Sequence, residues 1–273
     1  DVKITLSPYI DFDISNQDSN WDEKFWETIE KVNTLNKSLV KSKVKKTGFK
    51  VITYMKADLY DNNVKLEKPF IAKSNSEKIL LESKHKLNKG HTLKLVKFGG
   101  YVTSECNEWN KIENKANEIL NFLENTSFES LYQEHKLEWA KIWEQSDIKI
   151  SGDNKSQQAI RFNIFQLNQT YRGDNANLNF GPKGFTGEKY GGSTYWDTEA
   201  YCVPFCLGTK PPEVTLNLLN YRYLQLDKAI DNAKKLGFEK GAALFPMVTM
   251  NGEECHNEWE ITFEEIHRNN AIA

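Results

Sequence analysis

Trp196, Asp197 and Glu199 are the residues of this chain whose types and spacing best fit a chemical task. They follow shortly after residues 181–192, which contain five glycines. Glycine reaches backbone angles closed to other residues, so a ligand can approach the main chain of such a loop. An indole covers the apolar C–H face of a pyranose, while a carboxylate accepts hydrogen bonds from its hydroxyls. The segment therefore predicts a carbohydrate site; the alternative is a packed tryptophan followed by a helix-capping aspartate.

A second group of carboxylates lies between residues 253 and 265. It consists of Glu253, Glu254, Glu258, Glu260, Glu264 and Glu265, interleaved with His256, Trp259 and His267. Glycoside cleavage needs a carboxylic acid that protonates the leaving oxygen, together with a second carboxylate or an external nucleophile. From the residues alone, Glu254 and Glu258 are the candidates for that acid. The alternative is a solvated loop and helix face in which Trp259 only packs.

Other catalytic and metal-binding patterns do not fit the sequence. Residues 181–189 resemble a phosphate loop in their glycines, but they lack its Gly-Lys-Ser/Thr ending. Nucleophile elbows and His-Glu-x-x-His zinc helices are missing from the 273 residues. Cys202, Cys206, Cys255 and His256 lack the short paired spacing of structural zinc ligands. We therefore expect buried thiols, no metal, and chemistry carried by carboxylates.

The composition is that of a soluble globular protein. Of the 273 residues, 27% are charged, 39% hydrophobic and 12% aromatic, which excludes a disordered or membrane-spanning chain. This length supports one large domain or two ordinary ones, and we favour two. The four cysteines are too few for a disulfide scaffold. No apolar run reaches the ~18 residues of a transmembrane helix and no signal-peptide pattern opens the chain, so we expect a cytoplasmic protein without a membrane partner.

The charge gives no reason to expect a nucleic-acid partner. The formal net charge is −2, and such a chain has no field that gathers DNA or RNA. A basic run is formed by Lys41, Lys43, Lys45 and Lys46. We interpret this run as a solvated loop or an edge strand.

Up to about residue 103 the readable segments are short and strand-like. Apolar and polar residues alternate over residues 49–54, 78–81 and 92–98, with turn-forming residues between them. This pattern predicts an antiparallel sandwich with one solvated face per sheet. A short helix from Trp21 to about Leu35 is expected to interrupt it.

Beyond Thr103 the pattern becomes helical. Residues 107–124, 128–145 and 160–171 are predicted helices, and the last of them should stop at Gly173. A further apolar stripe runs over residues 219–233. Amphipathic helices joined by loops rich in glycine and aromatic residues predict a toroid of helical hairpins. Too few such helices fit before residue 273 to close a ring, so we interpret the chain as part of a longer protein.

Several segments together resemble glycoside hydrolase family 65, and within it the enzymes that act on maltose. They are residues 147–150, 161–167, 181–201, 219–223, 232–237 and 251–267. The resemblance implies an α+β multidomain fold. Its parts would be a partial antiparallel β-sandwich over residues 1–103, a helical linker over 104–152, and the incomplete N-terminal portion of an (α/α)6 catalytic barrel over 153–273.

The resemblance also implies a reaction, the reversible and inverting phosphorolysis of maltose to β-glucose 1-phosphate and glucose. In the family, the pair that matches Trp196 and Asp197 holds the transferred glucose, and the loop that follows residue 255 shapes the acceptor side. The binding residues expected in that loop are His256, Glu258, Trp259 and Thr262. Inorganic phosphate is the co-substrate, and no metal or organic cofactor is implied. The expected partners are a sugar, phosphate and a second copy of the chain in a homodimer.

The general acid of the family lies in a Gly-Pro-Asp/Asn-Glu type of motif, which residues 1–273 lack. On this resemblance we withdraw Glu254 as the candidate for the catalytic acid. The acid and the phosphate-binding residues are expected beyond Ala273. We expect residues 1–273 alone to be inactive. Two alternatives stay open. One is a family relative, phosphorylase or hydrolase, that acts on trehalose, kojibiose or nigerose, and the other is a non-catalytic sugar-binding module.

Overall fold

The computed structural model divides the chain into two compact units, Asp1–Glu134 and His135–Ala273. The division falls inside the helix α2 (Phe128–Ser146). The residues that the structure describes are 1–15, 24–35, 37–45, 48–104, 108–181, 193–255 and 265–272.

Within these ranges, no helix has the length and apolar character that crossing a bilayer requires.

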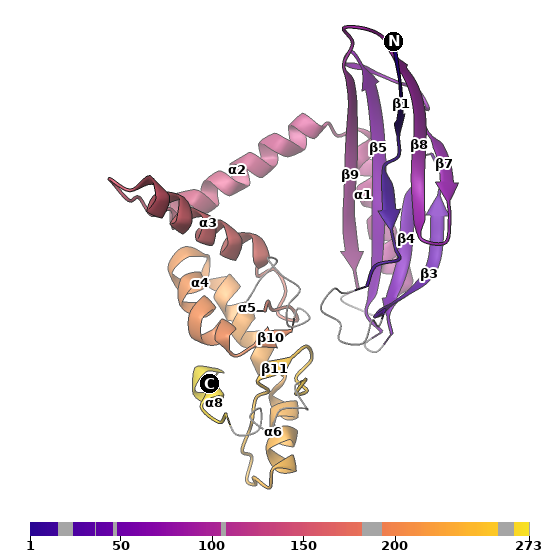
Figure 1. Cartoon of the computed structure of the whole chain (residues 1–273). Helices are drawn as coiled ribbons and strands as arrows, with labels where there is room; N and C mark the ends of the chain where they lie inside the picture. Colours follow the sequence, from indigo (N-terminus) through magenta and orange to yellow (C-terminus); the bar gives the residue numbers. More distant parts are fainter. Residues whose placement is uncertain are drawn as a thin grey trace. The chain divides into compact units, whose positions relative to one another are not determined.

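Antiparallel strands build the N-terminal unit (Figure 1). They are β1 (Val2–Leu6), β2 (Tyr9–Asp11), β3 (Trp26–Asn33), β4 (Ser38–Val44), β5 (Lys50–Asp61), β6 (Val64–Lys65), β7 (Ile71–Ser74), β8 (Lys78–Leu87) and β9 (Leu93–Thr103). One sheet has the order β1-β8-β2, with β7 also paired to β8, and the other has the order β3-β4-β5-β6, with β9 also paired to β5. The predicted antiparallel sandwich is confirmed, and β5, β8 and β9 contain its three predicted strands.

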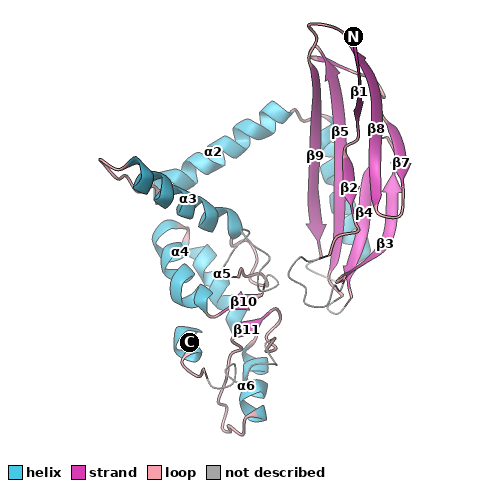
Figure 2. Ribbon diagram, viewed as in Figure 1, coloured by secondary structure: helices cyan, strands magenta, loops and turns pink. Residues whose placement is uncertain are grey.

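Both faces of the five-stranded sheet are covered. Met55 and Leu59 of β5 point inward and pack in one core with Ile79 of β8, because alternate residues of a strand face opposite sides. Ile52 points the other way and packs with Ile112 of the helix α1 (Trp109–Glu124). The expectation of one solvated face per sheet is wrong for this sheet, since α1 covers its outer face (Figure 2).

The helix expected between Trp21 and Leu35 is also wrong. Residues 26–33 form β3, which pairs with β4 in an antiparallel ladder. This pairing places Glu30 opposite Lys41, where the carboxylate and the ammonium group lie 2.6 Å apart. Cross-strand pairing of this kind outweighs a local helical preference.

Lys41 and Lys43 of the basic run belong to an interior strand, whereas Lys45 is exposed in the turn that follows it. β4 lies between β3 and β5, so the interpretation as a solvated loop or edge strand is wrong for residues 41–44, while Lys46 lies outside the described residues. The Lys41 ammonium group is 2.7 Å from Glu113 of α1 as well as close to Glu30. Burial alone would lower the pKa of Lys41, but the hydrogen bonds to these two carboxylates raise it. Lys41 therefore stays charged and ties α1 to the sheet.

Helices and two short strands build the described part of the C-terminal unit. They are α3 (Asn154–Thr170), β10 (Thr194–Tyr195), the π-helical turn η3 (Thr198–Cys202), α4 (Val203–Thr209), α5 (Pro212–Tyr223), α6 (Leu226–Lys235), β11 (Val248–Thr249) and α8 (Arg268–Ile272). The predicted helices over residues 107–124, 128–145 and 160–171 correspond to α1, α2 and α3. Gly173 follows α3 with a φ of +79°, and a Cβ there would lie 2.6 Å from a methyl group of Val214. A glycine is needed at this position because the chain turns against α5.

The apolar stripe predicted over residues 219–233 does not form one helix. The helical hydrogen bonding is interrupted between Tyr223 and Leu226, which gives α5 and α6. Tyr223, a member of the stripe, is 72% exposed, whereas Leu218 is fully buried. The side of α5 that enters the core is therefore the one that carries Leu218, and this side packs against α4.

We expect Ile52→Ala to lower the free energy of unfolding by about 2–5 kcal/mol, because the change leaves a cavity under α1. Urea unfolding followed by circular dichroism measures this. Val64→Ala is the control, since Val64 is 67% exposed and its truncation should cost less than about 0.5 kcal/mol. Equal, small effects of the two substitutions would mean that the outer face of the sheet is solvated.

Candidate functional site

Trp196 and Asp197 lie between a strand and a π-helical turn. The strand β10 pairs with β11 through Thr194 opposite Thr249 and Tyr195 opposite Val248. The turn η3 begins at the next residue after Asp197. Because this pairing is antiparallel, it brings the chain that precedes Val248 alongside Trp196 and Asp197, although the two segments are about fifty residues apart in sequence.

The indole of Trp196 is half-buried. Its ring centroid lies 6.2 Å from that of Tyr201, with the planes tilted by 44°, and 5.4 Å from that of His267, nearly perpendicular at 89°. Tyr201 is 68% exposed. The tryptophan is therefore an aromatic group at the surface of the unit and not a member of its sealed core. His267 was not predicted to lie at this site, although it stands within the acidic segment that the sequence singles out.

The side chain of Asp197 does not cap a helix. Its backbone is helical, with φ −55° and ψ −30°, and no hydrogen bond runs from the turn to its carboxylate. In the part of the chain that the structure describes, this carboxylate has no hydrogen-bond or ion-pair partner. A half-buried carboxylate without a protein partner keeps its lone pairs for the hydroxyl groups of a ligand.

The two residues after Asp197 are tied firmly to the protein. The Thr198 hydroxyl donates to the Phe180 carbonyl over 2.9 Å. Glu199 accepts two hydrogen bonds from Arg222 of α5, from Nε at 2.8 Å and from Nη2 at 3.0 Å. The side chains of the pair are only 2% and 3% exposed. Removing one partner of such a buried pair costs about 3–5 kcal/mol, because the other charge is left alone in the interior.

Sequence reasoning missed the role of Arg222. A usable signal was present, because Arg222 lies one turn beyond Leu218 on α5. An arginine on the buried side of a helix needs an acidic partner. The sequence contains 38 acidic residues, however, and nothing in their spacing singles out Glu199.

The loop expected to contact the acceptor sugar is only partly described. His256, Glu258, Trp259 and Thr262 lie outside the described residues, as does the glycine-rich segment 182–192. The described residues on either side of segment 256–264 lie near Trp196. At its start, the Cys255 amide donates to the carbonyl of Val248 on β11 over 2.8 Å, and beyond its end His267 contacts the indole.

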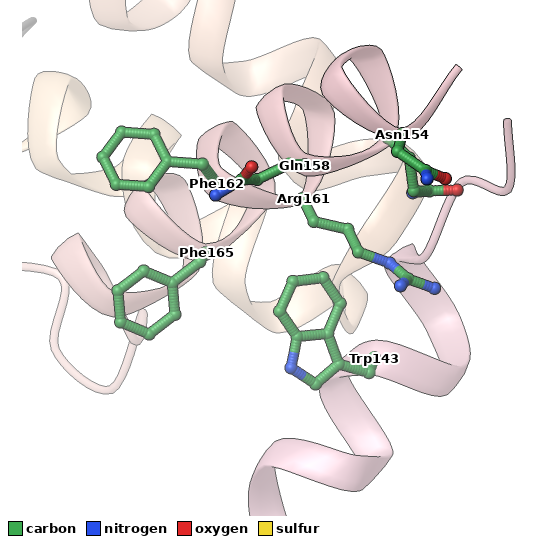
Figure 3. A pocket seen from close by; sticks show the side chains of 7 residues that line it. Trp143, Asn154, Gln158, Arg161, Phe162 and Phe165 are labelled. Atoms are coloured by element: carbon green, nitrogen blue, oxygen red, sulfur yellow. The ribbon is translucent and has the colours of Figure 1, made fainter.

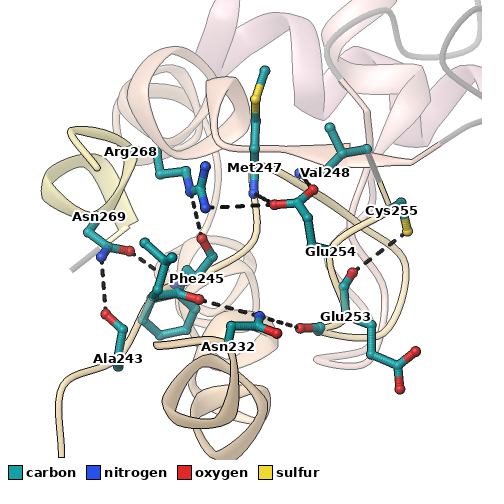
Figure 4. A network of polar contacts seen from close by, with 12 residues as sticks. Asn232, Ala243, Phe245, Met247, Val248, Glu253, Glu254, Cys255, Arg268 and Asn269 are labelled. Carbon is teal, nitrogen blue, oxygen red and sulfur yellow. Dashed lines mark hydrogen bonds and ion pairs between the residues drawn. The ribbon is translucent and has the colours of Figure 1, made fainter. Parts of the chain in front are cut away.

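Glu254 is engaged in holding this loop (Figure 4). Its carboxylate accepts hydrogen bonds from the backbone amides of Met247 at 2.7 Å and Val248 at 3.1 Å, and it lies 3.7 Å from the guanidinium group of Arg268. Arg268 in turn donates to the Phe245 carbonyl over 2.8 Å. Both oxygens of this carboxylate are thus occupied by backbone amides, which agrees with the withdrawal of Glu254 as the catalytic acid.

The thiols close to the site are protonated. Cys206 is buried and packs with Tyr171 and Leu218. Burial raises the pKa of Cys202 to about 11, and the negative charges of Glu199 and Asp197 act in the same direction. A thiol in this environment is not a nucleophile at neutral pH. Within the described ranges, no group of three or more metal-ligating side chains occurs.

A separate hollow of about 440 Å³ lies along α3. Trp143, Phe162 and Phe165 line it (Figure 3). Arg161 also lines it, but its guanidinium group is held by Asp147 through two hydrogen bonds of 2.8 and 2.7 Å. This ion pair fixes the turn between α2 and α3, and the hollow shares no residue with the Trp196 site.

Models of two protein domains match the chain. Residues 1–142 match the N-terminal domain of glycosyl hydrolase family 65, and residues 161–273 match its central catalytic domain. Among curated proteins, the chain is 44% identical to maltose phosphorylase of Bacillus subtilis (strain 168) over 100% of the chain and 35% of that protein. It is 38% identical to alpha,alpha-trehalose phosphorylase of Thermoanaerobacter brockii over 68% of the chain and 23% of that protein.

A solved structure has the same fold. It is a putative kojibiose phosphorylase from human microbiome, which matches with a TM-score of 0.86 and 25% identity over 99% of this chain and 34% of that chain. The chain thus spans about a third or less of the length of these relatives. The match confirms the predicted fold class, a partial β-sandwich followed by the first helices of an (α/α)6 barrel. Because its residues match the N-terminal and the central catalytic domain models of that family, the chain belongs to glycosyl hydrolase family 65.

Proposed function

We propose that the complete gene product is a disaccharide phosphorylase that converts maltose and phosphate into β-glucose 1-phosphate and glucose with inversion. The observation that carries this proposal is the carboxylate of Asp197, which has no partner among the described residues, next in sequence to the half-buried Trp196. The 44% identity to a maltose phosphorylase along the whole chain supports the choice of substrate.

Trp196 and Asp197 would form the site of the transferred glucose. The indole covers the C–H face of the ring, and the carboxylate accepts hydrogen bonds from its hydroxyl groups. Such hydrogen bonds strengthen as the ring approaches the oxocarbenium-like transition state. Asp197 would therefore contribute to the rate and not only to the affinity.

Phosphate takes the place of the water molecule and base of an inverting hydrolase. It attacks the anomeric carbon on the face opposite the departing glucose, so a single protein acid is needed to protonate the leaving oxygen. Glu254 is not that acid, because its carboxylate is bound by two amides of the 247–248 segment. We place the acid and the phosphate-binding residues beyond residue 273, which fits a chain that spans 35% of its maltose phosphorylase relative.

The acceptor side decides which disaccharide is used. Relatives named for trehalose and kojibiose also match this chain, so the family alone leaves the glycosidic linkage open. The loop with His256, Glu258, Trp259 and Thr262 resembles the maltose type of the family. Its described flanks, Cys255 and His267, lie next to the strand and the indole of the glucose site, as an acceptor-binding loop requires.

A cytoplasmic location is part of the proposal. In the described part of the chain, Cys202, Cys206 and Cys255 are free thiols. Free thiols persist in a reducing compartment, where phosphate and sugar phosphates are also present.

With maltose and phosphate, we expect the complete gene product to release β-glucose 1-phosphate, and with trehalose, kojibiose or nigerose to release about 100-fold less. A coupled assay measures the release, and proton NMR of the fresh product identifies the anomer. Residues 1–273 alone are the comparison and should release none. Preference for another disaccharide would refute maltose as the substrate. Glucose formed without phosphate would indicate a hydrolase, and sugar binding without any turnover would indicate a binding module.

Asp197→Asn in the complete gene product should lower kcat about 100-fold or more, because hydrogen bonds of the carboxylate to the sugar strengthen in the transition state. Initial rates at saturating maltose and phosphate measure it. Asp227→Asn is the matched control, since Asp227 is an exposed carboxylate in the first turn of α6 and its loss should leave kcat unchanged. If both variants turn over like the parent, Asp197 does not bind the transferred glucose.

A further inference from the structure

The buried ion pair between Glu199 and Arg222 adjoins the proposed glucose site along the chain. Glu199 is two residues beyond Asp197, and Arg222 lies in the last turn of α5. Their two hydrogen bonds, of 2.8 and 3.0 Å, join both carboxylate oxygens to Nε and Nη2. A bidentate pair of this kind fixes the orientation of the carboxylate as well as its position.

The pair is connected to Asp197 through the backbone. The amide of Glu199 donates to the Trp196 carbonyl at 3.1 Å, and the amide of Ala200 donates to the same oxygen at 3.3 Å. These bonds close the chain around Asp197, because Trp196 before it is linked to Glu199 and Ala200 after it. Thr198, anchored on the Phe180 carbonyl, holds the other side. A shift of Glu199 would therefore move the Asp197 backbone.

The same turn of α5 also holds the loop on the acceptor side. The hydroxyl of Tyr221 donates to the carbonyl of Met250 over 3.2 Å, and Met250 directly follows β11. Neighbouring residues of one helix thus anchor the segment that carries Trp196 and the segment that leads into the acceptor loop. The C-terminal end of α5 therefore fixes both segments of the site.

Stability alone is a poor explanation of this pair. Replacing a buried ion pair by apolar side chains is often neutral or stabilising, since two charges no longer have to be desolvated. The third guanidinium nitrogen, Nη1 of Arg222, is buried and has no hydrogen-bond partner in the described part of the chain. An arrangement selected for stability would satisfy this donor. The two short bonds to Glu199 instead favour a geometric role.

We infer that Glu199 and Arg222 are positioning residues, which hold the Asp197 carboxylate at the height and angle required by the transferred glucose. They do not touch the sugar. The inference rests on the proposed function and extends it, because it names the pair on which the reach of Asp197 depends. It also assigns Glu199, the fourth residue of the segment Trp196–Glu199, a task different from that of Asp197.

Three variants of the complete gene product test the inference. Glu199→Gln keeps the shape but loses the charge, and it should lower kcat about 100-fold, since a displacement of about 1 Å can cost that much. KM for phosphate should change less than threefold. The double variant Glu199→Met, Arg222→Met removes both charges, so its melting temperature should return to near the parent value while kcat stays low. Glu213→Gln, on the exposed first turn of α5, is the matched control and should behave like the parent.

A merely structural pair gives a different pattern. If kcat of the double variant recovers together with the melting temperature, or if Glu199→Gln keeps full kcat, the pair does not position Asp197. Failure of both variants to fold would also overturn the inference, because the pair would then serve the fold.

The parent protein separates this test from the test of the proposed function. If the unsubstituted complete gene product turns over none of the disaccharides, the proposed function is refuted. The positioning role is then decided by glucose binding in calorimetry. It predicts that Glu199→Gln weakens binding about tenfold or more and that the double variant does not restore it. Unchanged affinity in both variants would contradict it.

Discussion

In the proposed site, the carboxylate that binds the sugar must be fixed in position while its oxygen atoms stay available for the sugar hydroxyls. Asp197 meets this constraint through its neighbours. Thr198 and Glu199 carry the hydrogen bonds that fix the segment, to the Phe180 carbonyl and to Arg222, and the carboxylate of Asp197 itself makes no capping bond. The geometry of the site follows from this division of tasks between consecutive side chains.

The carboxylate of Glu254, in the segment after β11, shows the opposite arrangement, because the protein occupies both of its oxygen atoms. It belongs to the segment that the sequence marks as rich in carboxylates, yet both of its oxygens accept backbone hydrogen bonds and Arg268 lies beside it. The carboxylate shapes the chain that leaves β11 and has little capacity left for a substrate. The hydrogen-bond partners of a carboxylate, and not its residue type or spacing, show whether it stabilises the protein or is available to a ligand.

Local patterns predicted the parts of the fold that depend on local order. Alternation identified β5, β8 and β9, and periodicity identified α1, α2 and α3 with the stop at Gly173. Predictions failed where distant partners decide. Residues 26–33 form a strand because β4 pairs with them, and Lys41 is buried because α1 supplies Glu113. The outer face of the five-stranded sheet is covered for the same reason, since α1 packs on it.

The site was predictable to the same extent. Trp196 and Asp197 carry a compositional signal, an indole next to a carboxylate behind a glycine-rich loop, which points to a sugar without any knowledge of the fold. The ion pair of Glu199 and Arg222 has no such signal in the sequence. The two residues are 23 positions apart and meet only when α5 packs beside η3. The position of His267 against Trp196 likewise depends on the packing of α8, which follows His267, against η3.

The most direct measurement is a crystal structure of the complete gene product with bound glucose and phosphate. We expect one face of the pyranose against the Trp196 indole and a carboxylate oxygen of Asp197 about 2.5–2.7 Å from a sugar hydroxyl oxygen. The Glu199 and Arg222 pair should be intact behind it. Glucose bound elsewhere, for example in the hollow beside Trp143, with Trp196 covered by protein and Asp197 without contact to sugar, would contradict this account.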